Sequence, residues 1–195
     1  MLGSMTMSPL DHLADLAPER VRPLKRTEYE TMAAAGLFED ERVELLEGVI
    51  VEMSPQSPSH AAAIQRLDRI LQRLVGERAS IRVQMPFVAG DLSLPEPDVA
   101  VVPSGDYETA HPAEALLVVE VADSSLRKDR LVKAEIYARA GVPEYWVVGL
   151  FDELVEVHTE PAGVAYGRVT RAQRGDSIRP IALPDVAIAV DEIIR

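Results

Sequence analysis

The sequence predicts an α/β sandwich, in which a central mixed β-sheet is flanked by α-helices. Two amphipathic helical patterns, at about residues 58–78 and 128–140, alternate with short β-rich runs. A hairpin, a long helix, several strands, a second helix and more strands in this order are typical of that architecture. The 195 residues suffice for one well-cored domain. We therefore expect a flexible N-terminal arm at 1–24 and a single domain at 25–195.

After the arm, the chain is expected to form a short helix and a hairpin. Thr27 and Glu30 have the spacing of a capping box at the start of this helix. The run RVELLEGVIVEM, residues 42–53, then holds two β-rich segments around Glu47-Gly48. This dipeptide predicts a hairpin with a two-residue turn.

A longer helix and the strands of the sheet follow. Ser57 is the predicted N-cap of the helix and Pro58 its first residue. The apolar stripe of this helix is Ile64, Leu67, Leu71, Leu74 and Val75. Strands are predicted at 81–88, 98–102, 116–121, 144–150 and 154–158. Residues 185–194 either close the sheet or form a final short helix.

The composition excludes several classes of protein and site. The chain has no cysteine, which rules out disulfides and thiolate metal ligands. Its apolar runs are too short to span a bilayer, so no membrane insertion is expected. The first ten residues lack the pattern of a secretory signal, and we therefore expect a cytoplasmic protein.

The net charge of −12 argues against a generally basic surface for nucleic acid. Any contact with phosphates must then come from a local patch. Two predicted helices hold the candidates, Arg66, Arg69, Arg73 and Arg78 in one and Arg127, Lys128, Arg130, Lys133 and Arg139 in the other. Charged helical faces are usually just solvated, so these clusters alone indicate little.

Three acidic residues stand where the pattern predicts buried positions. Glu120 follows the run ALLVV, which is too apolar for a surface strand, and Asp98 directly precedes the apolar run 99–102. Glu44 shares its face of the hairpin with apolar side chains of both strands, because side chains alternate along a strand. A buried carboxylate is rare without a partner, so all three are candidates for a site.

A histidine and a lysine lie near these acids in the predicted fold. His60 begins the apolar stripe of the long helix, where a lone histidine is more often structural than a ligand. Lys133 lies four residues after Asp129, a spacing that is also explained by a surface ion pair. It neighbours core-facing positions of its helix as well, which places it close to the end of the strand that carries Glu120.

Acids on adjacent strands with a lysine nearby suit metal-assisted hydrolysis of a phosphodiester. Carboxylate oxygens are ligands that Mg²⁺ prefers, and this ion needs only one or two of them because it keeps several waters. The ion polarises a phosphoryl oxygen and lowers the pKa of a bound water, while a lysine offsets the charge that develops on the phosphate. A set of structural ion pairs is the alternative explanation for the same residues.

Four stretches of the chain carry a resemblance to a known family. They are VELLEGVIVEMSPQSPSH, PEPDVAVV, LLVVEVADSS and DRLVKAEIYARAGVPEYWVV. The order of a PD, a Glu at the end of an apolar strand and a Lys resembles the PD-(D/E)XK nuclease superfamily. The surrounding residues, from about Thr27 to Ile194, narrow this to a resemblance to the Uma-two family of putative restriction-endonuclease-like proteins.

The resemblance implies a restriction-endonuclease-like fold, Mg²⁺ (or Mn²⁺) as the cofactor and DNA as the substrate. It implies that Asp98 and Glu120 hold the metal. The full set of catalytic residues that it implies is Asp98, Glu120, Lys133, Glu44 and His60. Ala122 occupies the position of the motif's own lysine, so the resemblance assigns that role to a lysine of the following helix. Asp123 is a further departure, because the family usually has Ser there.

These observations favour a Mg²⁺-dependent endonuclease acting on DNA. The alternative is a nuclease-fold protein without turnover, a binding or regulatory module, which the net charge and Ala122 favour and the retained acids oppose. Hydrolysis of another phosphodiester, such as RNA or a small nucleotide, is a third reading. A two-fold homodimer would cut both strands of a duplex most easily. The acidic surface is also compatible with a partner protein that supplies the affinity for DNA.

Overall fold

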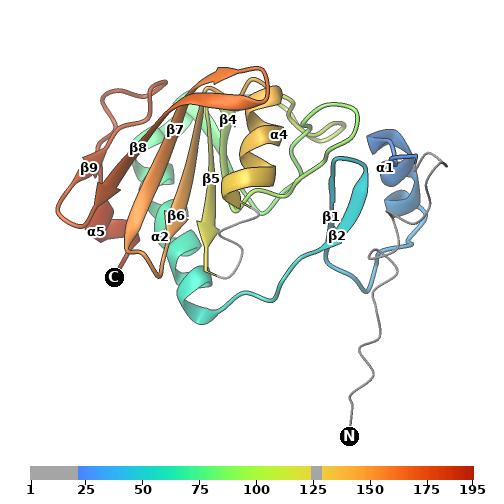
Figure 1. Ribbon diagram of the computed structural model, residues 1–195, viewed down its shortest axis with the longest axis horizontal. Coiled ribbons are helices and arrows are strands. Elements are labelled where there is room, and N and C mark those ends of the chain that lie inside the picture. Colours follow the sequence, from blue (N-terminus) through green and yellow to red (C-terminus); the bar gives the residue numbers. More distant parts are fainter. Residues whose placement is uncertain (1–21, 124–128) are drawn as a thin grey trace, which may run out of the picture.

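A six-stranded mixed sheet forms the centre of the protein in the computed structural model, which describes residues 22–123 and 129–195 (Figure 1). The strand order is β3-β4-β5-β6-β7-β8. Only β5 and β6 pair in parallel, and the other neighbours in this sheet are antiparallel. The strands are β3 (Ala79–Val83), β4 (Val99–Pro103), β5 (Leu117–Ala122), β6 (Glu144–Gly149), β7 (Leu154–Ala162) and β8 (Ala165–Gln173).

Helices cover both faces of this sheet. The helix α2 (Pro58–Val75) packs its apolar stripe against one face, together with the short C-terminal helix α5 (Val190–Ile193). The helix α4 (Ala134–Arg139) packs against the opposite face. Side chains alternate along a strand, so odd-numbered residues of β5 face α2 and even-numbered residues face α4. Glu120 therefore projects towards α4.

The helix predicted at 128–140 differs from expectation in its first turn. Asp129–Lys133 form a π-helical segment, η3, which continues into α4. A π turn adds a residue to the helical repeat and changes which side chains face the core. The sequence pattern gave the right place for this helix but not its wider first turn.

A smaller unit, formed by α1 (Arg26–Ala34) and the hairpin of β1 (Val43–Leu46) and β2 (Val49–Glu52), lies beside the sheet (Figure 1). The two-residue turn is confirmed, since Leu46 pairs with Val49. Both turn residues have positive φ, which a tight hairpin turn requires. The tyrosine hydroxyl of Tyr29 in α1 donates to the carbonyl of Val43 at 3.0 Å and so joins the helix to the hairpin.

Three sequence expectations are corrected at the ends of elements. The capping box is not Thr27 with Glu30, because the N-cap is Lys25, two residues earlier, and the Glu28 carboxylate accepts from the Lys25 backbone amide. The strand predicted at 81–88 ends at Val83, because Gln84 adopts a positive φ. The long helix α2 ends at Val75, and a short 3-10 segment, η2 (Gly76–Arg78), follows it.

Of the two alternatives considered for the C-terminal residues, the short final helix is confirmed and closure of the main sheet is wrong. A two-residue strand β10 (Ile188–Ala189) pairs with β9 (Ser177–Ile178) in a separate small sheet, and α5 follows directly. They do not extend the main sheet. Of the predicted N-terminal arm, residues 1–21 lie outside the described residues. In the described part of the chain, no helix is long and apolar enough to cross a membrane.

Candidate functional site

The register of the sheet brings Asp98 and Glu120 to one place. Val99 of β4 stands opposite Val119 of β5 in an antiparallel pair. Asp98, one residue before β4, therefore stands opposite Glu120, and opposed residues project to the same face of a sheet. Both side chains are nearly buried, with 7% and 3% of their surface exposed. Strand pairing alone thus explains why acids 22 positions apart share one site.

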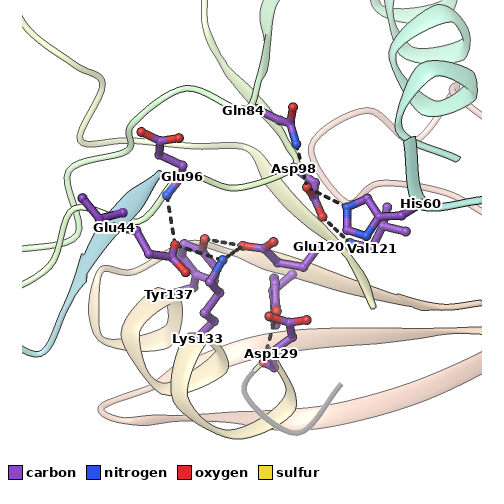
Figure 2. Close-up of polar contacts among 12 residues, drawn as sticks. Glu44, His60, Gln84, Glu96, Asp98, Glu120, Val121, Asp129, Lys133 and Tyr137 are labelled. Atoms are coloured by element: carbon purple, nitrogen blue, oxygen red, sulfur yellow. Dashed lines mark hydrogen bonds and ion pairs between the residues drawn. The ribbon is translucent and has the colours of Figure 1, made fainter. Parts of the chain in front are cut away.

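The side chain of Asp98 accepts a hydrogen bond from the backbone at the end of β5, in place of a carbonyl of a neighbouring strand. Its Oδ2 accepts a hydrogen bond from the Val121 amide at 2.8 Å. The backbone carbonyls of Pro97 and Asp98 accept instead from the backbone amide of Gln84, at 3.1 and 3.2 Å. The second carboxylate oxygen, Oδ1, contacts His60 Nε2 at 3.1 Å and Gln84 Nε2 at 3.3 Å (Figure 2). These contacts fix the direction of the carboxylate.

Lys133 enters the acid cluster from the helix that follows β5. Its Nζ donates to Glu120 Oε1 at 2.8 Å and forms an ion pair with Glu44 Oε2 at 3.1 Å. Tyr137, one turn further along, donates its hydroxyl to the same Glu120 oxygen at 2.8 Å. The hydrogen bonds of Glu120 to described residues therefore all use Oε1, as Figure 2 shows. Glu120 Oε2 is left to bind another group.

The alternative of a surface ion pair between Asp129 and Lys133 is wrong. Only 2% and 3% of their respective surfaces are exposed. The π segment turns both residues inward and leaves two of the three residues between them, Leu131 and Val132, exposed to solvent. The phenol of Tyr145 donates to the Asp129 carbonyl at 3.1 Å and holds the start of this segment against β6.

Glu44 reaches the site from the hairpin, outside the main sheet. Its predicted inward orientation is confirmed, because its side chain is fully buried. The apolar face expected across both strands is wrong, since β1 is buried at every position while β2 is mostly exposed, with Val49 at 45%. Besides Lys133, the Glu44 carboxylate accepts from the Glu96 amide at 3.3 Å.

His60 lies at the first turn of α2, next to Asp98. The predicted N-cap is confirmed, because Ser57 Oγ accepts from the His60 amide at 3.2 Å. Burial lowers the pKa of the His60 imidazole, but the hydrogen bond and the charge of Asp98 outweigh it and the net effect is a raised pKa. His60 therefore holds Asp98 from the side of α2.

All five predicted site residues line a single cavity of about 290 Å³. They are Glu44, His60, Asp98, Glu120 and Lys133. Four further lining residues, Arg42, Gln84, Glu96 and Asp129, were not predicted as site residues. The sequence gives a weak indication that Glu96 belongs to the site, because this acid lies between two prolines. It gives no indication for the neutral residue Gln84. Asp123, the departure from the family pattern, also lines the cavity.

The cavity carries more acidic than basic groups. Its carboxylates are Glu44, Glu96, Asp98, Glu120, Asp123 and Asp129, and its fixed cations are Arg42 and Lys133. Burial raises the pKa of Glu120; Lys133 opposes this rise and the neighbouring acids reinforce it. Burial likewise raises the pKa of Glu96.

Lys133 stays protonated in these surroundings. Burial lowers the pKa of its ammonium group, but the carboxylates of Glu120, Glu44 and Asp129 more than offset this, so the pKa is raised. A lysine of this kind cannot accept a proton at neutral pH. It can donate hydrogen bonds and neutralise negative charge in the cavity.

Within the described residues, the basic helical clusters do not form an open patch for phosphates. Most of their members in the described part of the chain bind groups of the protein itself. These contacts are Arg66 to the Ile193 carbonyl (2.8 Å), Arg73 to Glu192 (3.8 Å), Arg78 to Asp185 (2.8 Å), Arg130 to Glu156 (2.7 Å) and Arg139 to Glu47 (2.8 Å). Arg127 and Lys128 lie outside the described residues.

Comparison with known proteins identifies the family. A family model described as Uma2, putative restriction endonuclease, matches residues 26–191. The chain belongs to the Uma2 family. No curated protein matches it. The crystal structure of a putative nuclease belonging to DUF820 from Anabaena variabilis ATCC 29413 has a TM-score of 0.70, with 14% sequence identity, and the match covers 88% of this chain and 97% of that one. The predicted fold class and family are confirmed.

Ala122, which occupies the position where the resemblance expects a lysine, is buried in the apolar cluster under α4, together with Ala134. Lys133 contacts Glu120 from the following helix, although 13 positions separate the two residues.

Proposed function

We propose that this Uma2 protein is a Mg²⁺-dependent endonuclease that hydrolyses phosphodiester bonds in DNA. The observation that carries the proposal is the 2.8 Å contact between Lys133 Nζ and Glu120 Oε1. In the PD-(D/E)XK pattern a lysine follows the second acid by two positions, and here Ala122 occupies that position. The contact supplies a lysine beside Glu120 from the following helix instead. The family description and the nuclease-like fold support the hydrolase class. Mn²⁺ has the same preference for carboxylate oxygens and would replace Mg²⁺.

The donor atoms of the cavity fit a hard divalent cation. Asp98 uses three of the roughly four acceptor sites of a carboxylate, and Glu120 keeps Oε2. Among residues 22–123 and 129–195, no three His, Cys, Asp or Glu side chains make up a complete metal site. Mg²⁺ is the cation that suits such a partial set, because it is usually held by one or two carboxylates plus waters and substrate phosphates.

Each of the chain's own groups has a defined task in this proposal. Asp98 and Glu120 would hold the ion, which polarises the phosphoryl oxygen and lowers the pKa of a bound water. Lys133 donates one N–H to Glu120 and forms an ion pair with Glu44, and a remaining N–H can orient water or a phosphate oxygen. His60 and Gln84 keep the Asp98 carboxylate in position.

A binding protein without turnover is the second candidate, and one observation favours it. Lys133 is already paired with two buried carboxylates, so the site is partly neutralised without any cation. In that case the cavity would bind a cation or nucleic acid without cleaving a bond. Measuring binding and cleavage on the same preparation separates the two candidates.

The test is cleavage of supercoiled plasmid, single-stranded DNA and RNA by the full chain, with Mg²⁺, with Mn²⁺ and with EDTA. Asp98→Asn is the decisive variant, because it removes the charge and keeps an oxygen that accepts from the Val121 amide. We expect this variant to lose cleavage by about a hundredfold or more, as removal of a key electrostatic group does. Glu135→Gln, at an exposed position of α4, is the matched control for loss of one negative charge.

Each outcome of this test has a clear reading. Cleavage by wild type and Glu135→Gln but not by Asp98→Asn supports the proposal. Equal cleavage by Asp98→Asn means that the activity belongs to another site or to a contaminant. Metal binding without cleavage of any substrate favours the binding protein, and cleavage of RNA alone would replace DNA as the substrate.

A further inference from the structure

Arg42 projects into the same cavity as the acidic residues. It directly precedes β1, and its carbonyl accepts from the Met53 amide at 2.8 Å, which continues the register of the hairpin by one pair. Residues two apart in a strand project to the same face, so Arg42 and Glu44 point the same way. Arg42 and Met53 both line the cavity. The hairpin thus places a guanidinium group at the mouth and a carboxylate at the base.

Among the described residues that line the cavity, Arg42 is the fixed cation without a partner. In the described part of the chain its side chain has no hydrogen bond and no ion pair within 4.0 Å, although it is close enough for its charge to lower the pKa of Glu96 against the effect of burial. Lys133, the other fixed cation of the cavity, is buried and already bound to Glu120 and Glu44. Arg42 is exposed and keeps its donors for a ligand.

We propose that Arg42 binds the non-bridging oxygens of the substrate's phosphodiester at the mouth of the cavity. This inference rests on the proposed function and adds the residue that recognises the phosphate. A guanidinium has a planar set of donors that matches two phosphate oxygens at once. Gln56 and Ser54, from the segment that joins the hairpin to α2, line the same rim and present neutral polar groups beside it.

The charge of the molecule explains why one arginine matters here. The chain has a net charge of −12, and most described basic residues of the two helical clusters bind groups of the protein itself. A phosphate that approaches the acidic cavity is repelled unless a cation meets it at the entrance. Arg42 meets this requirement from a position fixed by the hairpin.

The test measures the affinity of fluorescently labelled single-stranded DNA, duplex DNA and RNA by anisotropy, in Ca²⁺, which we choose as a hard cation for measuring binding without turnover. Arg42→Ala is compared with Arg42→Lys and with Arg69→Ala. Arg69 is an exposed arginine of α2 outside the cavity, so both alanine variants change the net charge equally. Thermal unfolding confirms that each variant is folded.

Loss of a bidentate charged contact predicts about a tenfold to hundredfold rise in Kd for Arg42→Ala. The slope of log Kd against log salt concentration should fall by about one, as expected for one lost phosphate contact. Arg42→Lys should retain part of the affinity, and Arg69→Ala should leave both quantities unchanged.

The results separate this inference from the proposed function. Equal Kd values for Arg42→Ala and Arg69→Ala would overturn the role of Arg42 and leave the nuclease proposal standing. Binding that depends on Arg42, together with no cleavage in Mg²⁺ or Mn²⁺, supports this role and overturns the nuclease. A wild-type protein that binds none of the three oligonucleotides overturns both.

Discussion

Lys133 links the stability of the protein to its proposed chemistry. A buried ammonium group loses its hydration, and it remains charged here only because carboxylates of the hairpin and of β5 surround it. The same contacts give it the position of the missing motif lysine. One side chain therefore has two tasks, and a substitution must be tested for both.

Lys133→Met should destabilise the protein by about 3–5 kcal/mol, the usual cost of leaving a buried charge without its partner. The buried carboxylates of Glu120 and Glu44 would lose their counter-charge. Urea unfolding in EDTA measures the effect without any compensating cation. The double variant Glu120→Gln/Lys133→Met should lose less than the sum of its single variants, because it removes both members of one pair. Additive losses would mean that the two groups do not interact.

The π segment η3 adds two charged side chains to the acids that the sheet provides. It directs Asp129 and Lys133 inward and exposes Leu131 and Val132. Arg130 ties this element to the sheet, since its Nε binds the buried carboxylate of Glu156 on β7 at 2.7 Å. A second contact joins Arg130 to Asp152 at 3.1 Å, near the surface. The two contacts allow a matched comparison.

Glu156→Gln should destabilise the protein by about 1–3 kcal/mol, because the buried end of the Arg130 contact loses its charge. Asp152→Asn removes an exposed partner of the same arginine and should cost less than about 1 kcal/mol. Hydrogen exchange of the amides at 129–139 measures the local loosening. If the two variants behave alike, burial of the Glu156 contact does not control the position of η3.

At the scale of the whole molecule, the charge distribution limits how nucleic acid can bind. Arg66 and Arg73 of α2 and Arg78 of η2 hold the C-terminal segment, and Arg139 holds the hairpin through Glu47. If the rest of the chain adds no basic face to the described residues, the protein cannot release many counterions from DNA. Binding must depend on a few contacts at the cavity, on a divalent cation, or on a second protein or second copy.

The salt dependence of DNA binding should therefore be shallow. We expect a slope of log Kd against log salt that corresponds to about one to three phosphates, well below the six to ten of many DNA-binding proteins. Anisotropy titrations over a range of NaCl concentrations, in Ca²⁺, give the slope directly. A steep slope would show that a basic surface exists outside the described residues or forms on assembly, and light scattering at the same concentrations would report a dimer.

Much of the fold and of the site could be predicted from local sequence patterns. The hairpin turn follows from Glu47-Gly48, which can adopt two positive φ values. The inward positions of Glu44, Asp98 and Glu120 follow from the alternation of side chains along strands and from runs too apolar for the surface. These features depend on neighbours in the chain, and a single sequence contains that information.

The tertiary structure alone decided which groups meet. The sequence does not predict that Glu44 contacts Lys133. The two residues lie 3.1 Å apart because the separate hairpin that carries Glu44 packs beside the sheet. The inward turn of Asp129 required a π segment that the 3.6-residue period does not predict. Arg42 became a candidate only once the structure showed that it lines the cavity without a partner among the described residues. The burial of Glu44, Asp98 and Glu120 follows from local sequence. The partner of each group follows from long-range packing, since partners come from elements far apart in the chain.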